Sequence, residues 1–278
     1  MSDPGRTVVI VGATGTQGGP VARALLRSGY DVRAATRDSA GPAGRELAVL
    51  GAVPVRVDLG DPDTLVAAAD GASRAFLHLP MTLAGPGGGD VERAALDALR
   101  RAGVDHIALN TGMALPERPV GDPMLDGRIA FATALAGELR CPLRADAVNA
   151  WVTNEDVGAC VVAAFHRADA YAPDGSASLD RKLTLPDVAD RLARALGQPV
   201  RFQQISGAPY GEMMVPYLRE TLAAAVGAGH DRMPAARNPL LTPDTTSTRE
   251  ALGMTFMSVE DWARGLDWQR AARKAAHR

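Results

Sequence analysis

Short apolar runs alternate with longer segments of helical periodicity over the first 110 residues of the chain. The short runs are rich in β-branched residues and predict strands at 7–11, 31–37, 53–59, 74–80 and 104–110. Apolar residues recur at i, i+3 and i+4 between them, which predicts helices at 17–29, 61–71 and 89–103. Strands that alternate with helices at this spacing indicate right-handed crossovers and a parallel sheet with both faces covered. We therefore expect an α/β fold with a doubly wound parallel sheet.

The second half of the chain has a different pattern, in which helical segments predominate. Helices are predicted at 153–169, 211–229 and 258–278, and residues 183–200 indicate a strand end, a turn, a helix and a second strand. We expect two parts: a sheet domain of residues 1–150, and a smaller, mostly helical region of residues 151–278 packed beside it.

A glycine-rich stretch, GATGTQG at 12–18, directly follows the first predicted strand and opens the first predicted helix. In a dinucleotide-binding turn of this kind, Gly12 allows the tight turn, Gly15 lets the backbone approach a pyrophosphate, and Gly18 lets the helix pack on its strand. The positive end of the helix then faces the phosphates. We predict a nucleotide site that includes Thr14, Thr16 and Gln17; the alternative is a turn with a purely structural role.

The end of the second predicted strand indicates which nucleotide the site prefers. An acidic residue there would accept a hydrogen bond from the ribose 2′-hydroxyl of NAD, but Thr36 and Arg37 occupy this place. An arginine can donate several hydrogen bonds to a 2′-phosphate. We therefore expect NADP, with NAD the weaker ligand; the alternative is that Arg37 is a solvated surface arginine.

Composition excludes several classes of protein. The net charge of −2 gives no reason to expect direct contact with nucleic acid or an anionic membrane. No apolar run reaches 18 residues, and the start of the chain lacks the pattern of a signal peptide. Cys141 and Cys160 have no CxxC spacing, and the five histidines are scattered, so no metal site is expected. We expect a cytoplasmic protein.

Several stretches of the chain resemble the NmrA-like family of atypical short-chain dehydrogenases/reductases. They lie at 8–38, 55–65, 75–80, 101–112, 151–165, 183–200 and 258–265. The resemblance implies a Rossmann domain that binds NAD(P), followed by a substrate-binding region. It implies that Asp58 and Leu59 line the adenine. It also implies that five residues lie along the cofactor toward the nicotinamide: Leu79, Pro80, Asn110, Thr111 and Gly112.

The chain departs from the family pattern in two places. Related enzymes carry a Tyr-x-x-x-Lys pair that donates a proton beside the nicotinamide, whereas here no tyrosine has a lysine four residues later. After residue 128 the chain lacks about one helix–strand unit of the family pattern, or roughly 30 to 40 residues. The expected sheet then lacks its sixth strand; the alternative is a divergent stretch of ordinary length.

Candidates for proton transfer are few. His78 lies near the end of the fourth predicted strand, where a core position is the alternative, and Thr111 lies at the end of the fifth, where a cap or turn role is the alternative. We expect an oxidoreductase of secondary metabolism that reduces a small or polyketide-like carbonyl, enone or quinone by hydride transfer. The alternatives are a non-catalytic NADP(H)-sensing regulator, and a non-redox cyclase, epimerase or lyase. We expect a small-molecule substrate as partner, and a homodimer is left open.

Overall fold

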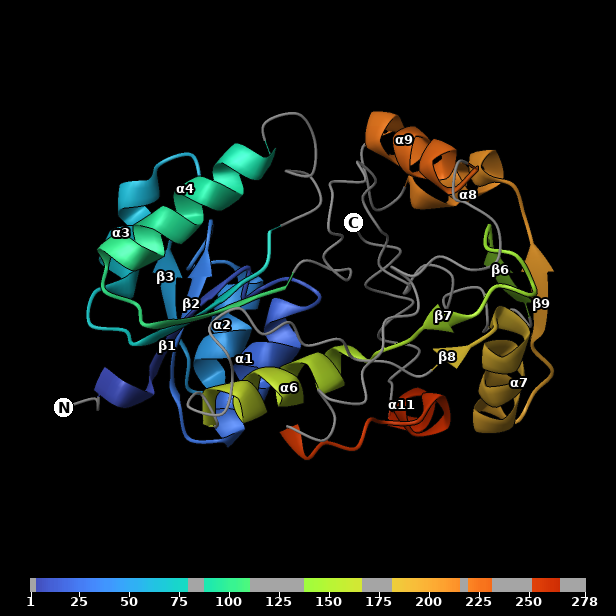
Figure 1. Ribbon diagram of the computed structural model, residues 1–278, viewed down its shortest axis with the longest axis horizontal. Helices are drawn as coiled ribbons and strands as arrows, with labels where there is room; N and C mark the ends of the chain where they lie inside the picture. Colours follow the sequence, from blue (N-terminus) through green and yellow to red (C-terminus); the bar gives the residue numbers. More distant parts are fainter. Residues whose placement is uncertain are drawn as a thin grey trace. The chain divides into compact units, whose positions relative to one another are not determined.

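The computed structural model describes residues 4–79, 88–110, 138–166, 182–215, 220–231 and 252–265 (Figure 1). The chain forms two compact units. The first unit comprises residues 1–111, 153–177 and 246–254, and the second comprises 112–152, 178–245 and 255–278. The chain thus passes between the units several times, whereas the sequence predicted one boundary at residue 150. The assignment of a cofactor role to 1–150 and a substrate role to 151–278 stays a prediction.

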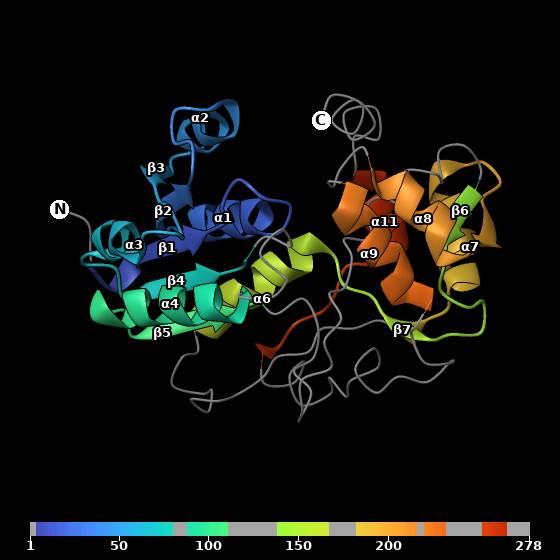
Figure 2. The same ribbon diagram turned by 90° about the horizontal axis from the view of Figure 1, so that it is seen from above.

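The first unit contains a parallel sheet of five strands in the order β3-β2-β1-β4-β5. A short 3-10 helix, η1 (Pro4–Arg6), precedes the sheet. The strands are β1 (Thr7–Val11), β2 (Asp31–Thr36), β3 (Val53–Arg56), β4 (Arg74–Leu77) and β5 (His106–Leu109) (Figure 2). Every neighbouring pair is parallel, as the alternation of strands and helices predicted. The strand order reverses between β1 and β4.

Helices cover both faces of this sheet (Figure 1). The helices of one face are α3 (Pro62–Ala69) and α4 (Gly88–Arg101); those of the other are α1 (Gly18–Arg27), α2 (Pro42–Val49) and α6 (Asn154–His166). Successive side chains of β1 point to opposite faces, so Val8 and Ile10 join the core with α1 and α6, and Val9 and Val11 the core with α3 and α4. Burial on both faces explains why β1 is an unbroken apolar run.

Two features of the first unit differ from the sequence analysis. Helix α2 was not predicted: only Gly44 and Leu47 are buried in it, so its sequence carries little apolar periodicity. Several strands also end earlier than predicted, since β4 ends at Leu77 and β5 at Leu109. His78 and Asn110 therefore lie in the segments that follow these strands.

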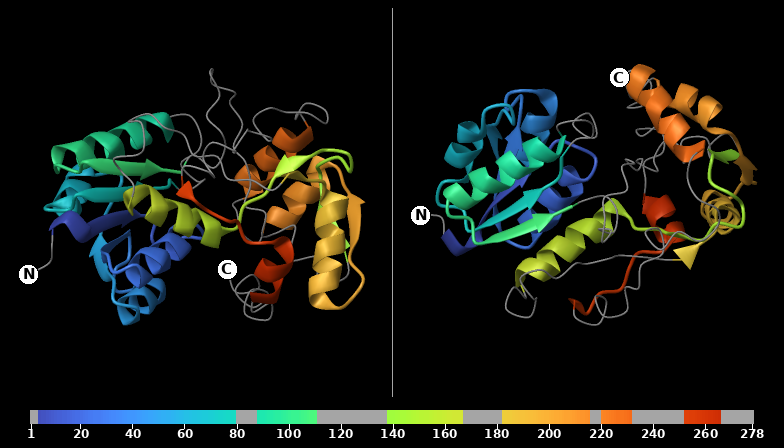
Figure 3. Two further views of the ribbon diagram at one scale, coloured as in Figure 1. Left: turned by 60° about the horizontal axis from the view of Figure 1, so that its bottom comes forward. Right: turned by 45° about the horizontal axis from the view of Figure 1, so that its top comes forward.

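The second unit has its own hydrophobic core, which includes Leu139, Leu185 and Leu192. Its strands are β6 (Glu138–Cys141), parallel to β9 (Arg201–Gln204), and β7 (Asn149–Ala150), antiparallel to β8 (Lys182–Leu183). Its helices are α7 (Leu185–Leu196), α8 (Gly207–Met214), α9 (Glu220–Asp231) and α11 (Val259–Gly265). Figure 3 shows α7 beside β9. The capping box of Thr184 begins α7, and Gly197, with φ of +67°, ends it.

The missing sixth strand stays a prediction. In the described part of the first unit β5 is the last strand of the sheet, and β6 pairs with β9 in the second unit. Residues 111–137, where a helix and a strand would follow in the family pattern, lie outside the described residues. None of the described helices combines the length and the apolar character needed to cross a membrane.

Candidate functional site

The residues that the sequence assigned to a cofactor site follow all five strands of the first sheet. Because the strands are parallel, their carboxyl ends meet at one edge of the sheet. The described candidates at this edge are Gly12, Thr14, Gly15, Thr16, Gln17, Gly18, Arg37, Asp58, Leu59, His78, Leu79 and Asn110. Pro80, Thr111 and Gly112 lie outside the described residues. Ligands of open α/β sheets bind at this edge, where the strand order reverses.

The three glycines of the turn after β1 have different surroundings. Gly12 has φ of +81°, and a Cβ atom there would lie 2.9 Å from the carbonyl oxygen of His78. A Cβ atom on Gly18 would lie 2.2 Å from the carbonyl oxygen of Gly12, so this position holds α1 tightly against the turn. Gly15 is exposed to solvent, and its N–H donates to the Gly12 carbonyl at 2.9 Å. The turn thus has two glycines packed against the protein and a third, Gly15, that is exposed.

Helix α1 begins inside this turn, at Gly18. Gln17 is its N-cap residue, but the side chain of Gln17 makes no capping hydrogen bond, and the first turn of α1 contains no acidic residue. The positive end of the helix dipole is therefore not neutralised by a carboxylate of its own first turn. Together with the exposed Gly15, this end of α1 suits a phosphate group.

Arg37 immediately follows β2 and is exposed. Within the described residues its side chain makes no ion pair or hydrogen bond, so its guanidinium can reach a ligand. Two hydroxyl groups lie beside the end of β2: Thr36 Oγ1 is 3.5 Å from Thr14 Oγ1, which comes from the turn after β1. The next residue, Asp38, has its carboxylate beside Gly41, the N-cap residue of α2. Thr36 and Arg37 therefore occupy the place where an NAD site carries an acid, with Thr14 beside Thr36.

In the loop after β3, Asp58 makes hydrogen bonds within the loop that the sequence did not predict. One oxygen of its carboxylate accepts a hydrogen bond from the Gly60 N–H at 2.9 Å, and its own N–H donates to Thr64 Oγ1 at 3.0 Å. Asp58 is nevertheless exposed, while Leu59 packs against the core on the α3 and α4 face. The Asp58 side chain thus shapes the loop in which it would meet an adenine.

A chain of hydrogen bonds joins the segments that follow β1, β4 and β5. The Nδ1 atom of His78 lies 3.2 Å from the carbonyl oxygen of Asn110. The side-chain amide of Asn110 donates to Oε1 of Gln17, and the Asn110 N–H donates to the Leu77 carbonyl at 2.9 Å. These contacts were not predicted, because the three residues are far apart in sequence and only the strand order brings them together. These hydrogen bonds make the edge polar beside β4 and β5, and they link the segments that follow β1, β4 and β5.

Other reactive residues of the described chain do not form a competing centre. Burial raises the pKa of both thiols, Cys141 and Cys160, to about 11, so neither is poised as a nucleophile. Asp156 is buried but exchanges hydrogen bonds with Thr153 as the capping box of α6. Within the described ranges no group of three histidine, cysteine or acidic residues could hold a metal ion.

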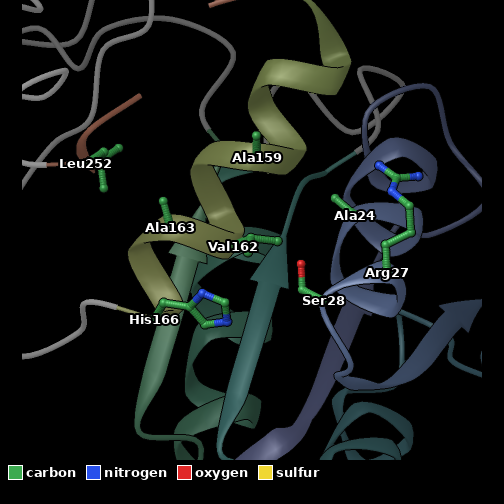
Figure 4. A pocket seen from close by; sticks show the side chains of 8 residues that line it. All are labelled: Ala24, Arg27, Ser28, Ala159, Val162, Ala163, His166 and Leu252. Atoms are coloured by element: carbon green, nitrogen blue, oxygen red, sulfur yellow. The ribbon is translucent and has the colours of Figure 1, made fainter. Parts of the chain in front are cut away.

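A separate pocket of about 370 Å³ lies between α1 and α6 (Figure 4). It is beside the carboxyl end of α1, and thus at the opposite end of this helix from the glycine turn. Its lining is formed mainly by small apolar side chains, together with the polar residues Arg27, Ser28 and His166: Ala24, Arg27, Ser28, Ala159, Val162, Ala163, His166 and Leu252. It contains none of the residues predicted to bind a cofactor.

Comparison with known proteins agrees with the geometry of the first unit. Residues 4–118 match the model of the NmrA-like family. An NAD(P)H azoreductase of Xenophilus azovorans is 29% identical over 230 residues, which cover 72% of this chain and 77% of the azoreductase. An NmrA-like family domain-containing oxidoreductase of Aspergillus hancockii is 40% identical over 113 residues, 38% of this chain and 34% of that protein. The match thus spans about one third of the fungal relative.

Solved structures share the fold over most of the chain. An NADPH-dependent quinone oxidoreductase of Escherichia coli, in complex with NADPH, has a TM-score of 0.66 at 20% identity and covers 92% of this chain and 98% of its own. NmrA, a negative transcriptional regulator, in complex with NAD has a TM-score of 0.70 at 18% identity and covers 95% and 99%. These likenesses show a Rossmann-type α/β fold. In its matching family model, its strand order and its glycine turn, the segment of residues 4–118 is similar to the NmrA-like family.

Proposed function

We propose that this chain binds NADP(H) at the carboxyl edge of the five-stranded sheet and is an oxidoreductase for a small carbonyl, enone or quinone. NADPH supplies a hydride when it is bound. Gly15 and the first turn of α1 would hold the pyrophosphate, and Arg37 with the hydroxyls of Thr14 and Thr36 would hold the 2′-phosphate. Asp58 and Leu59 flank the adenine, and the nicotinamide end lies toward Leu79 and Asn110.

The observation that carries this proposal is the arrangement of the glycine turn at the point where the strand order reverses. Gly12 and Gly18 make close contacts that a side chain would break, while the exposed Gly15 leaves room for a ligand beside an uncapped helix end. A purely structural turn needs the first two features but not the third. The family-model match of residues 4–118, the azoreductase relative and the quinone oxidoreductase fold neighbour support a redox role.

The proposed reaction is tested by following NADPH oxidation by absorbance against a panel of quinones, enones and azo dyes. We expect turnover that saturates with at least one of these acceptors, and weaker activity with NADH. The matched control is the Gly15→Val variant, assayed with the same acceptors in the same buffer. Its side chain fills the space proposed for the pyrophosphate. Turnover by the variant equal to that of the wild type would contradict the assignment of the site.

The sequence also supports a second candidate, a regulator that binds NADP(H) without turning it over. None of the four tyrosines has a lysine four residues later, so the proton donor of related enzymes is absent. A protein that shares the fold, NmrA, is a negative transcriptional regulator. Saturable NADPH binding with no oxidation by any acceptor in the panel would favour this candidate over the oxidoreductase.

A further inference from the structure

His78 lies just beyond the carboxyl end of the sheet. It directly follows β4, which lies beside β1 at the reversal of strand order, and it is half-buried. The buried residues of the two cores that cover the sheet do not include it. Its backbone lies close to the glycine turn of residues 12–18: a Cβ atom on Gly12 would be 2.9 Å from the His78 carbonyl oxygen. The imidazole is therefore tied to the cofactor turn but retains access to solvent.

The contact with Asn110 determines which ring nitrogen is available. The Nδ1 atom lies 3.2 Å from the Asn110 carbonyl oxygen, and a carbonyl oxygen can only accept a hydrogen bond. Nδ1 must therefore carry a hydrogen, whether the ring is neutral or charged. Nε2 is then the nitrogen left free to exchange a proton with a ligand. A backbone carbonyl on one nitrogen is a common way to orient a histidine whose other nitrogen reacts.

The Asn110 carbonyl is itself held in place. The Asn110 N–H continues the ladder between β4 and β5 through the Leu77 carbonyl, and the Asn110 side chain donates to Gln17 in the cofactor turn. A shift of the imidazole would thus have to disturb contacts from three strand ends. Within the described residues no acidic or basic side chain makes an ion pair or hydrogen bond with the His78 ring.

We propose that His78 is the catalytic proton donor of this chain, in place of the tyrosine that related enzymes use. The inference rests on the proposed NADPH-dependent function. The hydride from NADPH forms a C–H bond at the electrophilic carbon of the substrate, and the π electrons of the C=O bond move to oxygen. That oxygen takes the proton from Nε2 of the His78 imidazolium, which leaves neutral imidazole and NADP⁺. Water returns the proton to Nε2 before the next turnover.

The test compares His78→Gln with a matched control, His106→Gln, in the full chain. His106 is exposed at the first residue of β5, at the opposite edge of the sheet, so its change removes an imidazole without touching the site. A contribution of 10²-fold or more is typical of a positioned acid. We expect His78→Gln to lose about that factor in kcat with the acceptor that the wild type uses best, and His106→Gln to retain wild-type kcat.

Three further readouts separate proton donation from a structural role. Calorimetric titration should give His78→Gln the same affinity for NADPH as the wild type, because no proposed phosphate contact is changed. In the wild type kcat should fall as the pH rises, since only the imidazolium carries a proton on Nε2, and this fall should vanish in His78→Gln. Nitrogen-15 NMR of the imidazole in the unliganded wild type should show Nδ1 protonated throughout the titration.

The outcomes distinguish this inference from the proposed function. If wild-type protein fails to bind NADPH, the proposed function itself is wrong. If it binds NADPH but reduces no acceptor, or if His78→Gln keeps wild-type kcat and pH dependence, the proton-donor role is overturned while the nucleotide site stands. An NMR titration in which Nδ1 loses its proton would also overturn it.

Discussion

Gly15 and Gly18 stand three positions apart in one turn, yet a side chain at each would meet different surroundings. A Cβ atom on Gly18 would come within 2.2 Å of a backbone oxygen, which the fold cannot accommodate. A Cβ atom on Gly15 would lie 3.1 Å from the Gly12 oxygen, a tight contact that a shift of a few tenths of an ångström relieves, and the residue is exposed. The two positions therefore separate folding from ligand binding.

Gly15→Val should fold but lose nucleotide affinity, because the branched side chain fills the space that a pyrophosphate needs. We expect a loss of at least tenfold in affinity for NADPH, measured by NADPH fluorescence, with a circular dichroism spectrum like that of the wild type. Gly18→Val is the companion variant and should be destabilised. Unchanged NADPH affinity in a folded Gly15→Val protein would show that the ligand lies elsewhere.

Arg37→Glu should reverse the preference for NADP over NAD. A charge-assisted hydrogen bond contributes about 1.5–3 kcal/mol, or roughly ten- to hundredfold in affinity. The substitution removes this contact and puts a negative charge against the 2′-phosphate, whereas the affinity for NAD should change little. Added salt should weaken the wild-type preference, because the contact is exposed.

The matched control for this charge change is Arg93→Glu, which alters an exposed arginine on α4. Parallel titrations with NADP and NAD are the measurement. A wild type that binds both nucleotides equally, or an Arg37→Glu protein with the same ratio as Arg93→Glu, would make Arg37 an ordinary surface residue.

The two cysteines should resist thiol reagents in the folded protein. Burial raises the pKa of each thiol to about 11 from 9.0, and only the thiolate reacts. Labelling at pH 8 should therefore be about a hundredfold slower than in denatured protein from the thiolate fraction alone, and it should accelerate as the pH approaches 11. Mass spectrometry of timed samples, with Cys141→Ser and Cys160→Ser to assign the sites, gives the rates. Fast labelling of both native thiols at pH 8 would contradict their burial.

At the scale of elements, helix α6 joins the sheet through close packing on α1. A Cβ atom on Gly158 would lie 3.0 Å from the Pro20 carbonyl oxygen and 3.1 Å from the Ala24 Cβ atom. Near its other end, Phe165 packs against Tyr30, whose ring centroid lies 6.3 Å away, and His166 stacks on the same ring. The helix that follows residue 150 is in this way part of the Rossmann unit.

Gly158→Val should lower the free energy of unfolding by about 1–3 kcal/mol, the usual cost of overpacking. The control is Ala159→Val, which introduces the same residue on the same helix at an exposed position and should cost only a few tenths of a kcal/mol. Urea denaturation of both variants measures the difference. Equal midpoints would mean that α1 and α6 do not pack as closely as the structure shows.

At the scale of the whole molecule, the sequence predicted the features that depend on residues close together in the chain. Runs such as 7–11, buried on both faces, and the turn at 12–18 carry strong signals, so the parallel sheet and the glycine turn between β1 and α1 were predictable. The short helix α2 was missed because only two of its residues are buried. The contact between His78 and Asn110 was missed because it depends on β4 lying beside β5, and the packing of α6 on α1 because it joins residues far apart in sequence.

We propose that one NADP(H) binds per chain, at the edge of the sheet formed by the turn after β1 and the ends of β2 and β4. Calorimetric titration of the wild-type protein with NADPH tests it most directly. We predict a saturable heat with a stoichiometry of one, and a rise in stability of about 2.7 kcal/mol when the free nucleotide is at 100 times Kd. Absence of binding heat, together with an unchanged unfolding midpoint in excess NADPH, would contradict the account.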